Sequence, residues 1–300
     1  MKTDSKQDIY ARVTNRIVEQ LEEGVRPWLK PWTSNSGDGQ VSRPLRHNGE
    51  PYSGINVVLL WCDAMEKGFS SSTWMTYKQA ESLGAHVRKG QRGSTVVYAD
   101  RFKKTETDDK GEESYREIPF MKAYTVFNIQ QIEGLPERFL PQAKEEGPAP
   151  EPILAAEEFF AATGATFCHG GARAFYAPGP DFIQLPELAD FRDAESYAAT
   201  KAHELIHWTG AKSRMNREFG GRFGDTSYAR EELVAELGAA FLCADLGVSL
   251  EPRPDHASYL ESWLSVLKED KRAIFAAAAH SQRASDFLHG LQTQDALKTA

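Results

Sequence analysis

Cysteine is scarce in this sequence and long apolar runs are missing, and these absences exclude several classes of protein. The chain has 300 residues and 3 cysteines, Cys62, Cys168 and Cys243. An odd, widely spaced set predicts a reducing, cytoplasmic location and excludes a disulfide scaffold. Apolar stretches such as residues 55–62 are too short to cross a bilayer, and the charged amino terminus lacks the apolar segment of a secretory signal. We therefore expect a cytoplasmic protein without a membrane partner.

The net charge of −8 is unevenly distributed along the chain. Residues 1–140 hold 20 Lys+Arg against 19 Asp+Glu, a net charge of +1, whereas residues 141–300 hold 15 against 24, a net charge of −9. An acidic half invites comparison with proteins that mimic DNA. Its acidic residues are scattered through predicted helices, however, and do not form a duplex-like array.

A proline-rich segment divides the chain into two predicted domains. Residues 141–152 contain four prolines and a glycine beside a run of charge, which neither a helix nor a strand tolerates. We interpret this segment as a linker between a domain at 1–140 and a domain at 153–300.

The apolar periodicity of both parts predicts the α+β fold class. The first part combines helices with two strands at 94–102 and 120–129, and its charge-dense residues 104–113 are expected to form a long mobile hairpin loop. The second part is predicted to be mainly helical, with a small sheet that includes a hairpin at 174–185.

The pattern HExxH at residues 203–207 carries the most chemical information. On a helix, the i, i+4 spacing places His203 and His207 on one face, where both imidazoles can reach one tetrahedral cation. Glu204 then faces the open position, as a general base for peptide hydrolysis. The alternatives are a histidine face without a metal and a structural or vestigial metal site.

A catalytic zinc site takes a third protein ligand, and a later helix offers three glutamates for it. We predict that Glu232 is the ligand and that Glu236, one turn later, supports a histidine from behind. Glu231 or Glu236 is the alternative ligand. The predicted cation is Zn²⁺, with Mn²⁺ as the alternative. Tyr228 either stabilises an oxyanion or is an ordinary core tyrosine.

Cations alternate with tryptophans in a proline-flanked strip of the first part. Trp28, Lys30 and Trp32 could stack unpaired bases on indole rings while the cation contacts phosphates. The alternative is that the tryptophans are core and the cations are solvated. Further candidates for contact with single-stranded DNA are Arg43, Arg46, Tyr52, Trp74, Arg88, Lys89 and Arg92.

Several of these segments together resemble the ArdC family of plasmid antirestriction proteins. They are residues 9–32, 52–56, 74–76, 89–93, 203–210 and 231–238. The resemblance implies an amino-terminal single-stranded-DNA-binding domain, similar to that of TraC-type plasmid primases, and a zincin-like metallopeptidase domain. It also implies that the protein protects incoming plasmid DNA from host restriction during conjugation.

Two other functions fit the same motifs. The protein could be a metalloendopeptidase that cleaves a host protein of unknown identity, or a DNA-binding module whose metal is structural or vestigial. Replacement of Glu204 distinguishes them, because only a peptidase needs this carboxylate for its biological activity.

Overall fold

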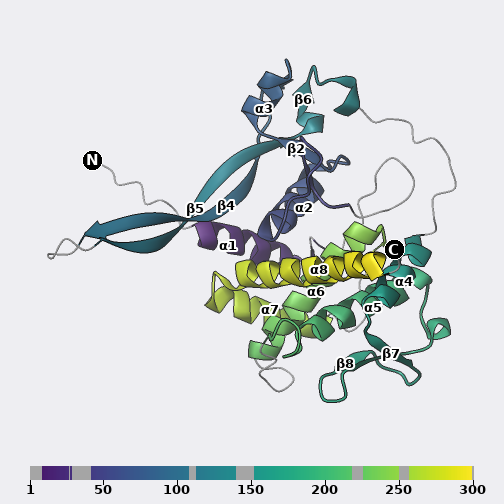
Figure 1. Ribbon diagram of the computed structural model, residues 1–300. Helices are drawn as coiled ribbons and strands as arrows, with labels where there is room; N and C mark the ends of the chain where they lie inside the picture. The colour runs from purple at the N-terminus through teal and green to yellow at the C-terminus, as the bar shows by residue number, and fades with distance from the viewer. Residues whose placement is uncertain are drawn as a thin grey trace.

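The computed structural model describes residues 9–26, 28, 42–107, 113–139, 152–217, 226–249 and 257–298. Lys30, Trp32 and all of the predicted linker except Pro152 lie outside these ranges. Figure 1 shows an α+β protein in which a helical body carries a sheet whose strands β4 and β5 extend into a long ribbon, together with two smaller sheets. Within the described part of the chain, no helix is long and apolar enough to cross a membrane.

In its described residues, the first part combines the helices α1, α2 and α3 with a four-stranded sheet in the order β1-β2-β5-β4 and a two-stranded pair, β3-β6. Its α3 begins with a capping box, in which Thr76 and Gln79 each bond the other's backbone amide. The elements are α1 (Ile9–Glu22), β1 (Leu45–Arg46), α2 (Ile55–Lys67), β2 (Thr73–Met75), α3 (Tyr77–Ser82), β3 (His86–Val87), β4 (Ser94–Thr107), β5 (Glu113–Asn128) and β6 (Ile132–Glu133).

The ribbon of β4 and β5 is longer than the sequence predicts. The two strands pair in continuous antiparallel register from Ser94↔Val126 to Thr107↔Glu113, and Figure 1 shows them extending away from the helices. The expectation that all of residues 104–113 form a loop is therefore wrong, because ladder hydrogen bonds join backbone groups and so continue from Lys104 to Thr107 opposite residues 113–116.

The second part is mainly helical, as predicted, with a sheet in the order β7-β9-β8. Strand β8 pairs antiparallel with β9 across the turn, which confirms the predicted hairpin at 174–185. The elements are α4 (Pro152–Ala162), β7 (Thr166–His169), β8 (Phe175–Ala177), β9 (Phe182–Leu185), α5 (Ala194–Thr209), α6 (Thr226–Leu246), α7 (Ala257–Glu269) and α8 (Ala273–Lys298).

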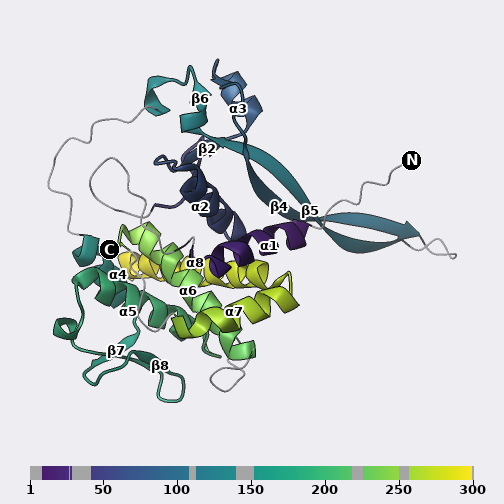
Figure 2. The ribbon, with the colours of Figure 1, turned by 180° about the vertical axis from the view of Figure 1, so that it is seen from behind.

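One hydrophobic core joins the two parts. Helix α1 buries Val13, Ile17 and Leu21 in the same cluster as residues of α5, α6 and α8, and Figure 2 shows α1 lying against the helices of the second part. The hydroxyl of Thr14 donates a hydrogen bond of 2.7 Å to the carbonyl of Lys271. The amino-terminal helix is therefore part of the helical body that holds the candidate site.

Helices α5 and α6 approach each other closely where the candidate site lies. A Cβ placed on Gly238 of α6 would be 2.9 Å from three side-chain carbons of Ile206 on α5. Contact this close needs a residue without a side chain at position 238. It brings the carboxylates at the start of α6 next to the histidines of α5.

Candidate metal centre

Helix α5 presents the two histidines of the HExxH pattern on one face. Asp193 caps the amino end by accepting a 2.7 Å hydrogen bond from the backbone amide of Ser196, and the helix ends at Gly210. Its apolar residues Leu205 and Ile206 are fully buried on the other side. His203 and Glu204 are each 4% exposed, and His207 is partly exposed, so the first four residues of the pattern are anchored in the core.

Three ligand atoms converge between α5 and α6. The Nε2 atoms of His203 and His207 are 3.2 Å apart. One oxygen of Glu232 lies 3.5 Å from the Nε2 of His203, and the other lies 3.6 Å from the Nε2 of His207. Among the described residues, these three form a group with ligand atoms within 4.8 Å of one another. Two imidazoles and one carboxylate are the donor set of a catalytic zinc site.

The other two glutamates of α6 stand behind the histidines. An oxygen of Glu231 is 3.3 Å from the Nδ1 of His207, and an oxygen of Glu236 is 3.7 Å from the Nδ1 of His203. A carboxylate on Nδ1 orients the ring and leaves Nε2 to face a cation. This geometry agrees with Glu232 as the ligand and with Glu236 as a supporting residue. Glu231, the alternative ligand, faces the Nδ1 of His207 and so occupies a supporting position.

Arg217 balances the buried charge of Glu231, and sequence reasoning missed this residue. Its guanidinium bonds both carboxylate oxygens of Glu231, with the shortest distance at 2.9 Å. It also donates to the hydroxyl of Thr209 and the carbonyl of Ile206 near the end of α5. A lone arginine in a loop gives no periodic signal, so its role emerges only from the folded structure.

Contacts between the carboxylates and the imidazoles shift the pKa values of Glu232 and His207. Burial alone raises the pKa of Glu232, but the hydrogen bond from His203 and the charge of His207 outweigh it and lower that pKa to about 2. Burial alone lowers the pKa of His207, but the hydrogen bond with Glu231 and the charges of Glu232 and Glu204 raise it to about 9. The cluster thus concentrates negative charge around a site where a divalent cation can replace a proton, so the residues fit a metal ion.

Tyr228 and Glu204 complete the surroundings of the cluster. The hydroxyl of Tyr228 hydrogen-bonds to Glu232 and lies 3.2 Å from the hydroxyl of Tyr259. Burial, the contact with Tyr259 and the charge of Glu232 raise the pKa of Tyr228 far above its ordinary value, so the phenol stays protonated and can donate. Glu204 adjoins His203 in the chain, and its charge contributes to the raised pKa of His207.

Several of the residues predicted to contact DNA from the first part are buried. Trp28 and Trp74 are each 1% exposed and Arg43 is 7% exposed. Trp28 donates a 3.4 Å hydrogen bond to Glu236 and packs edge-on against Trp263, while Arg43 pairs with Asp245. Base stacking by the two tryptophans and phosphate contact by Arg43 are thus wrong, because these side chains are core.

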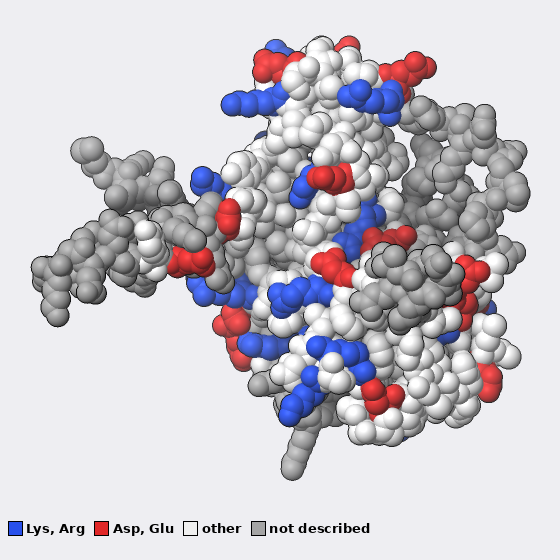
Figure 3. Space-filling model, in the orientation of Figure 1, with Lys and Arg blue, Asp and Glu red and all other residues white. Residues whose placement is uncertain are grey.

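Of the remaining predicted contacts, four cations lie on the surface, Tyr52 is buried, and Lys30 and Trp32 fall outside the described residues. Arg46, Arg88, Lys89 and Arg92 are exposed, and Tyr52 is 8% exposed beneath the guanidinium of Arg46. Figure 3 shows basic and acidic side chains intermingled on the visible face, without one continuous basic field. Contact with a nucleic acid therefore needs a local feature in addition to charge.

Comparison with known proteins matches both parts of the chain. Residues 7–127 match the N-terminal domain of anti-restriction factor ArdC, and residues 154–280 match a zincin-like metallopeptidase. The metal-free crystal structure of antirestriction ArdC protein from plasmid R388 superposes with a TM-score of 0.79 at 46% identity, over 96% of this chain and 98% of that one. The Mn(II)-bound structure gives a TM-score of 0.75 at 47% identity, over 95% and 98% of the two chains.

Two curated relatives extend this result. The uncharacterised protein y4eC of Sinorhizobium fredii is 40% identical over 291 residues, which cover 95% of this chain and 93% of y4eC. A DNA primase TraC of Escherichia coli is 38% identical over 302 residues, which cover 94% of this chain and 27% of the primase. The chain thus corresponds to about a quarter of that primase, whereas it matches the R388 ArdC structure over nearly its full length. This protein belongs to the ArdC family of antirestriction proteins.

Proposed function

We propose that this protein protects incoming plasmid DNA from host restriction during conjugation, binds single-stranded DNA and holds a divalent cation on His203, His207 and Glu232. The family membership and the TraC-like relative support the setting of plasmid transfer. The convergence of three ligand atoms within 4.8 Å is the observation that carries the metal site. Zn²⁺ suits two imidazoles and a carboxylate, and the Mn(II)-bound form of R388 ArdC supports Mn²⁺ as the alternative.

The residues around the ligands suit hydrolysis of a peptide bond. When bound, the cation supplies a Lewis acid that polarises a carbonyl and makes water more acidic. Glu204 can accept the proton from that water, and the protonated hydroxyl of Tyr228 can donate to the developing oxyanion. Glu231 and Glu236 hold the two imidazoles in place throughout. A peptidase acting on a host protein is therefore the first alternative for the biological role.

The burial of the cluster favours a second alternative, a DNA-binding module with a structural metal. Glu204 is 4% exposed and Glu232 is 7% exposed, so a peptide backbone could reach them only after neighbouring groups move. A cation there would still tie α5 to α6 and stabilise the helical body.

Three glutamine variants separate these roles in a conjugation assay with a restricting recipient. Glu232→Gln removes a ligand, Glu204→Gln removes only the general base, and Glu261→Gln on the exposed face of α7 is the control. Loss of protection by both site variants indicates catalysis, and loss by Glu232→Gln alone indicates a structural metal. Full protection by both excludes a role for the metal in antirestriction.

The proposed DNA binding has its own test. Filter binding of the purified protein should show higher affinity for a single strand than for a duplex of the same length and sequence. Equal affinity for the two would contradict this part of the proposal.

A further inference from the structure

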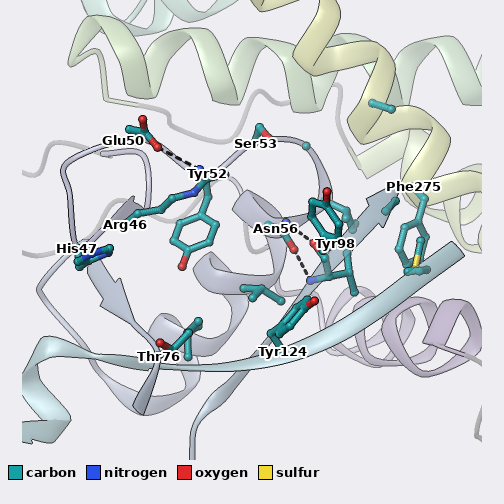
Figure 4. A pocket seen from close by; sticks show the side chains of 18 of the residues that line it. Arg46, His47, Glu50, Tyr52, Ser53, Asn56, Thr76, Tyr98, Tyr124 and Phe275 are labelled. Carbon is teal, nitrogen blue, oxygen red and sulfur yellow. Dashed lines mark hydrogen bonds and ion pairs between the residues drawn. The ribbon is translucent and has the colours of Figure 1, made fainter. Parts of the chain in front are cut away.

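A pocket of about 880 Å³ opens where the two parts of the chain meet. Its walls are the loop before α2, one face of the β4–β5 ribbon and the first turns of α8 (Figure 4). This volume lies within the range of about 300–1,000 Å³ that ligand pockets occupy. The pocket is separate from the metal centre, since none of His203, His207 or Glu232 lines it.

Two tyrosines present exposed rings on the ribbon wall. Tyr98 of β4 is 50% exposed and Tyr124 of β5 is 45% exposed. Their rings stand edge to face with centroids 6.5 Å apart at 72°. Two positions along each strand, on the same face, Val96 and Val126 are buried, so the tyrosines project from a fixed strand pair. Large aromatic rings that stay in solvent beside a pocket are typical of binding surfaces.

The loop before α2 brings polar groups to the opposite wall. The guanidinium of Arg46 lies 5.5 Å from the ring centroid of Tyr52 and pairs with Glu50 at 3.1 Å. The Nδ1 atom of His47 is buried and has no hydrogen-bond partner among the described residues. A cation at the rim and an unpaired ring nitrogen can contact a phosphate and a base edge.

The loop is held in this position by α8. The side-chain oxygen of Gln282 accepts hydrogen bonds from Arg43 at 2.8 Å and from the backbone amide of Gly54 at 3.1 Å. In the first turn of α2, just after the loop, Asn56 bonds both backbone groups of Val97 on β4, at 2.7 and 2.8 Å (Figure 4). The pocket is thus preformed, which lowers the entropic cost of binding.

We propose that this pocket binds unpaired nucleotides of single-stranded DNA, with bases stacked on Tyr98 and Tyr124 and the sugar-phosphate backbone passing Arg46. The inference rests on the proposed single-strand binding and names its site. Stacking accepts any base because every base has a π face, so the pocket is tolerant of sequence. A duplex is excluded, because its bases are already stacked within the helix and cannot reach the rings. Because Glu50 already pairs with Arg46, we expect stacking on the tyrosines to contribute more to the binding free energy than the phosphate contact of Arg46.

Fluorescence anisotropy with a labelled oligo-dT strand tests the pocket in the full-length protein. We compare wild type with three variants, the double variant Tyr98→Ala/Tyr124→Ala, the double variant Tyr98→Phe/Tyr124→Phe and the control Tyr77→Ala. Tyr77 lies on α3, is 52% exposed and does not line the pocket. Thermal melts establish that each variant is folded.

The alanine pair should weaken binding at least tenfold, since removal of one stacking ring costs about 1–3 kcal/mol per base. The phenylalanine pair should bind like wild type, because the rings are retained, and so should Tyr77→Ala. Photocrosslinking of an oligonucleotide with 5-iodouracil should label the peptides that carry Tyr98 or Tyr124.

Two outcomes would overturn the inference, and they are distinguishable. If wild type binds the strand and the folded alanine pair binds it equally well, the pocket is not the site, although single-strand binding stands. If wild type itself fails to bind oligo-dT, the proposed DNA binding fails and the pocket proposal fails with it.

Discussion

The indole of Trp28 connects the amino-terminal part of the chain to the metal centre. Its Nε1–H donates to one oxygen of Glu236 at 3.4 Å, and the other oxygen of Glu236 faces the Nδ1 of His203 at 3.7 Å. Removal of this donor takes away one of the contacts that position the Glu236 carboxylate beside the imidazole. We therefore predict that Trp28→Phe weakens binding of a divalent cation although it touches no ligand.

The expected size follows from the place of Trp28 in this chain of contacts. Loss of a residue that directly orients a ligand costs about 10–100-fold in metal affinity. Trp28 acts through Glu236 across a long hydrogen bond, so we expect the low end of this range. The prediction is a loss of about tenfold, equivalent to ~1.4 kcal/mol.

Trp263 provides a matched control. It is also 1% exposed and packs edge-on against Trp28 with ring centroids 6.3 Å apart. Its Nε1 atom has no hydrogen-bond partner in the described part of the chain. Trp28→Phe and Trp263→Phe therefore remove similar volumes from one place in the core, but only the first removes a hydrogen bond to the metal centre.

Isothermal titration of the metal-free variants with MnCl₂ measures the difference. We expect a normal affinity for Trp263→Phe and a weakened one for Trp28→Phe, with both proteins folded at the assay temperature. Equal affinities for the two variants would refute the idea that Trp28 orients His203 through Glu236.

Three further predictions concern stability. Arg217→Met removes the guanidinium that balances the buried carboxylate of Glu231 and leaves it, among the described residues, only the contact with His207, so it should lower the free energy of unfolding by about 3 kcal/mol in denaturant titration, unlike an exposed arginine variant. Gly238→Ala should destabilise the folded protein by about 1–3 kcal/mol, because the added methyl would lie 2.9 Å from carbons of Ile206. Gly290→Ala should instead stabilise the folded protein, because the space around Gly290 is open and alanine favours a helix over glycine. The hydrogen bond from Arg214 lowers the pKa of Asp181 below its ordinary value of 3.8. The free energy of unfolding at pH 7 should therefore be higher for wild type than for Asp181→Asn by at most ~1 kcal/mol. In melts at a series of pH values, this difference should vanish as the pH falls below 3.8.

The metal centre was accessible to sequence reasoning because its information is local. His203 and His207 lie one helical turn apart, and Glu232 and Glu236 lie one turn apart on another helix, so helical periodicity alone assigns each pair to a face. It was harder to predict which glutamate stands behind which histidine. Glu231 supports His207 only because α5 and α6 meet at Gly238, and a single sequence does not report the angle at which two helices cross.

The DNA contacts were predicted less well, for a different physical reason. A tryptophan between prolines and cations has the same local pattern whether it lies in a groove or reaches into a core, and burial is decided by distant residues. Trp28 is buried because Trp263 and Glu236, more than 200 positions later, receive it. Tyr98 and Tyr124 were passed over because strand alternation marks a face without showing which face borders a pocket.

The central claim is that His203, His207 and Glu232 together bind one divalent cation, and titration of metal-free protein measures this directly. We predict one Zn²⁺ or Mn²⁺ per wild-type chain and a loss of that site in a folded Glu232→Gln variant, while Glu261→Gln keeps it. Binding of one cation to the folded Glu232→Gln variant with wild-type affinity would contradict the account.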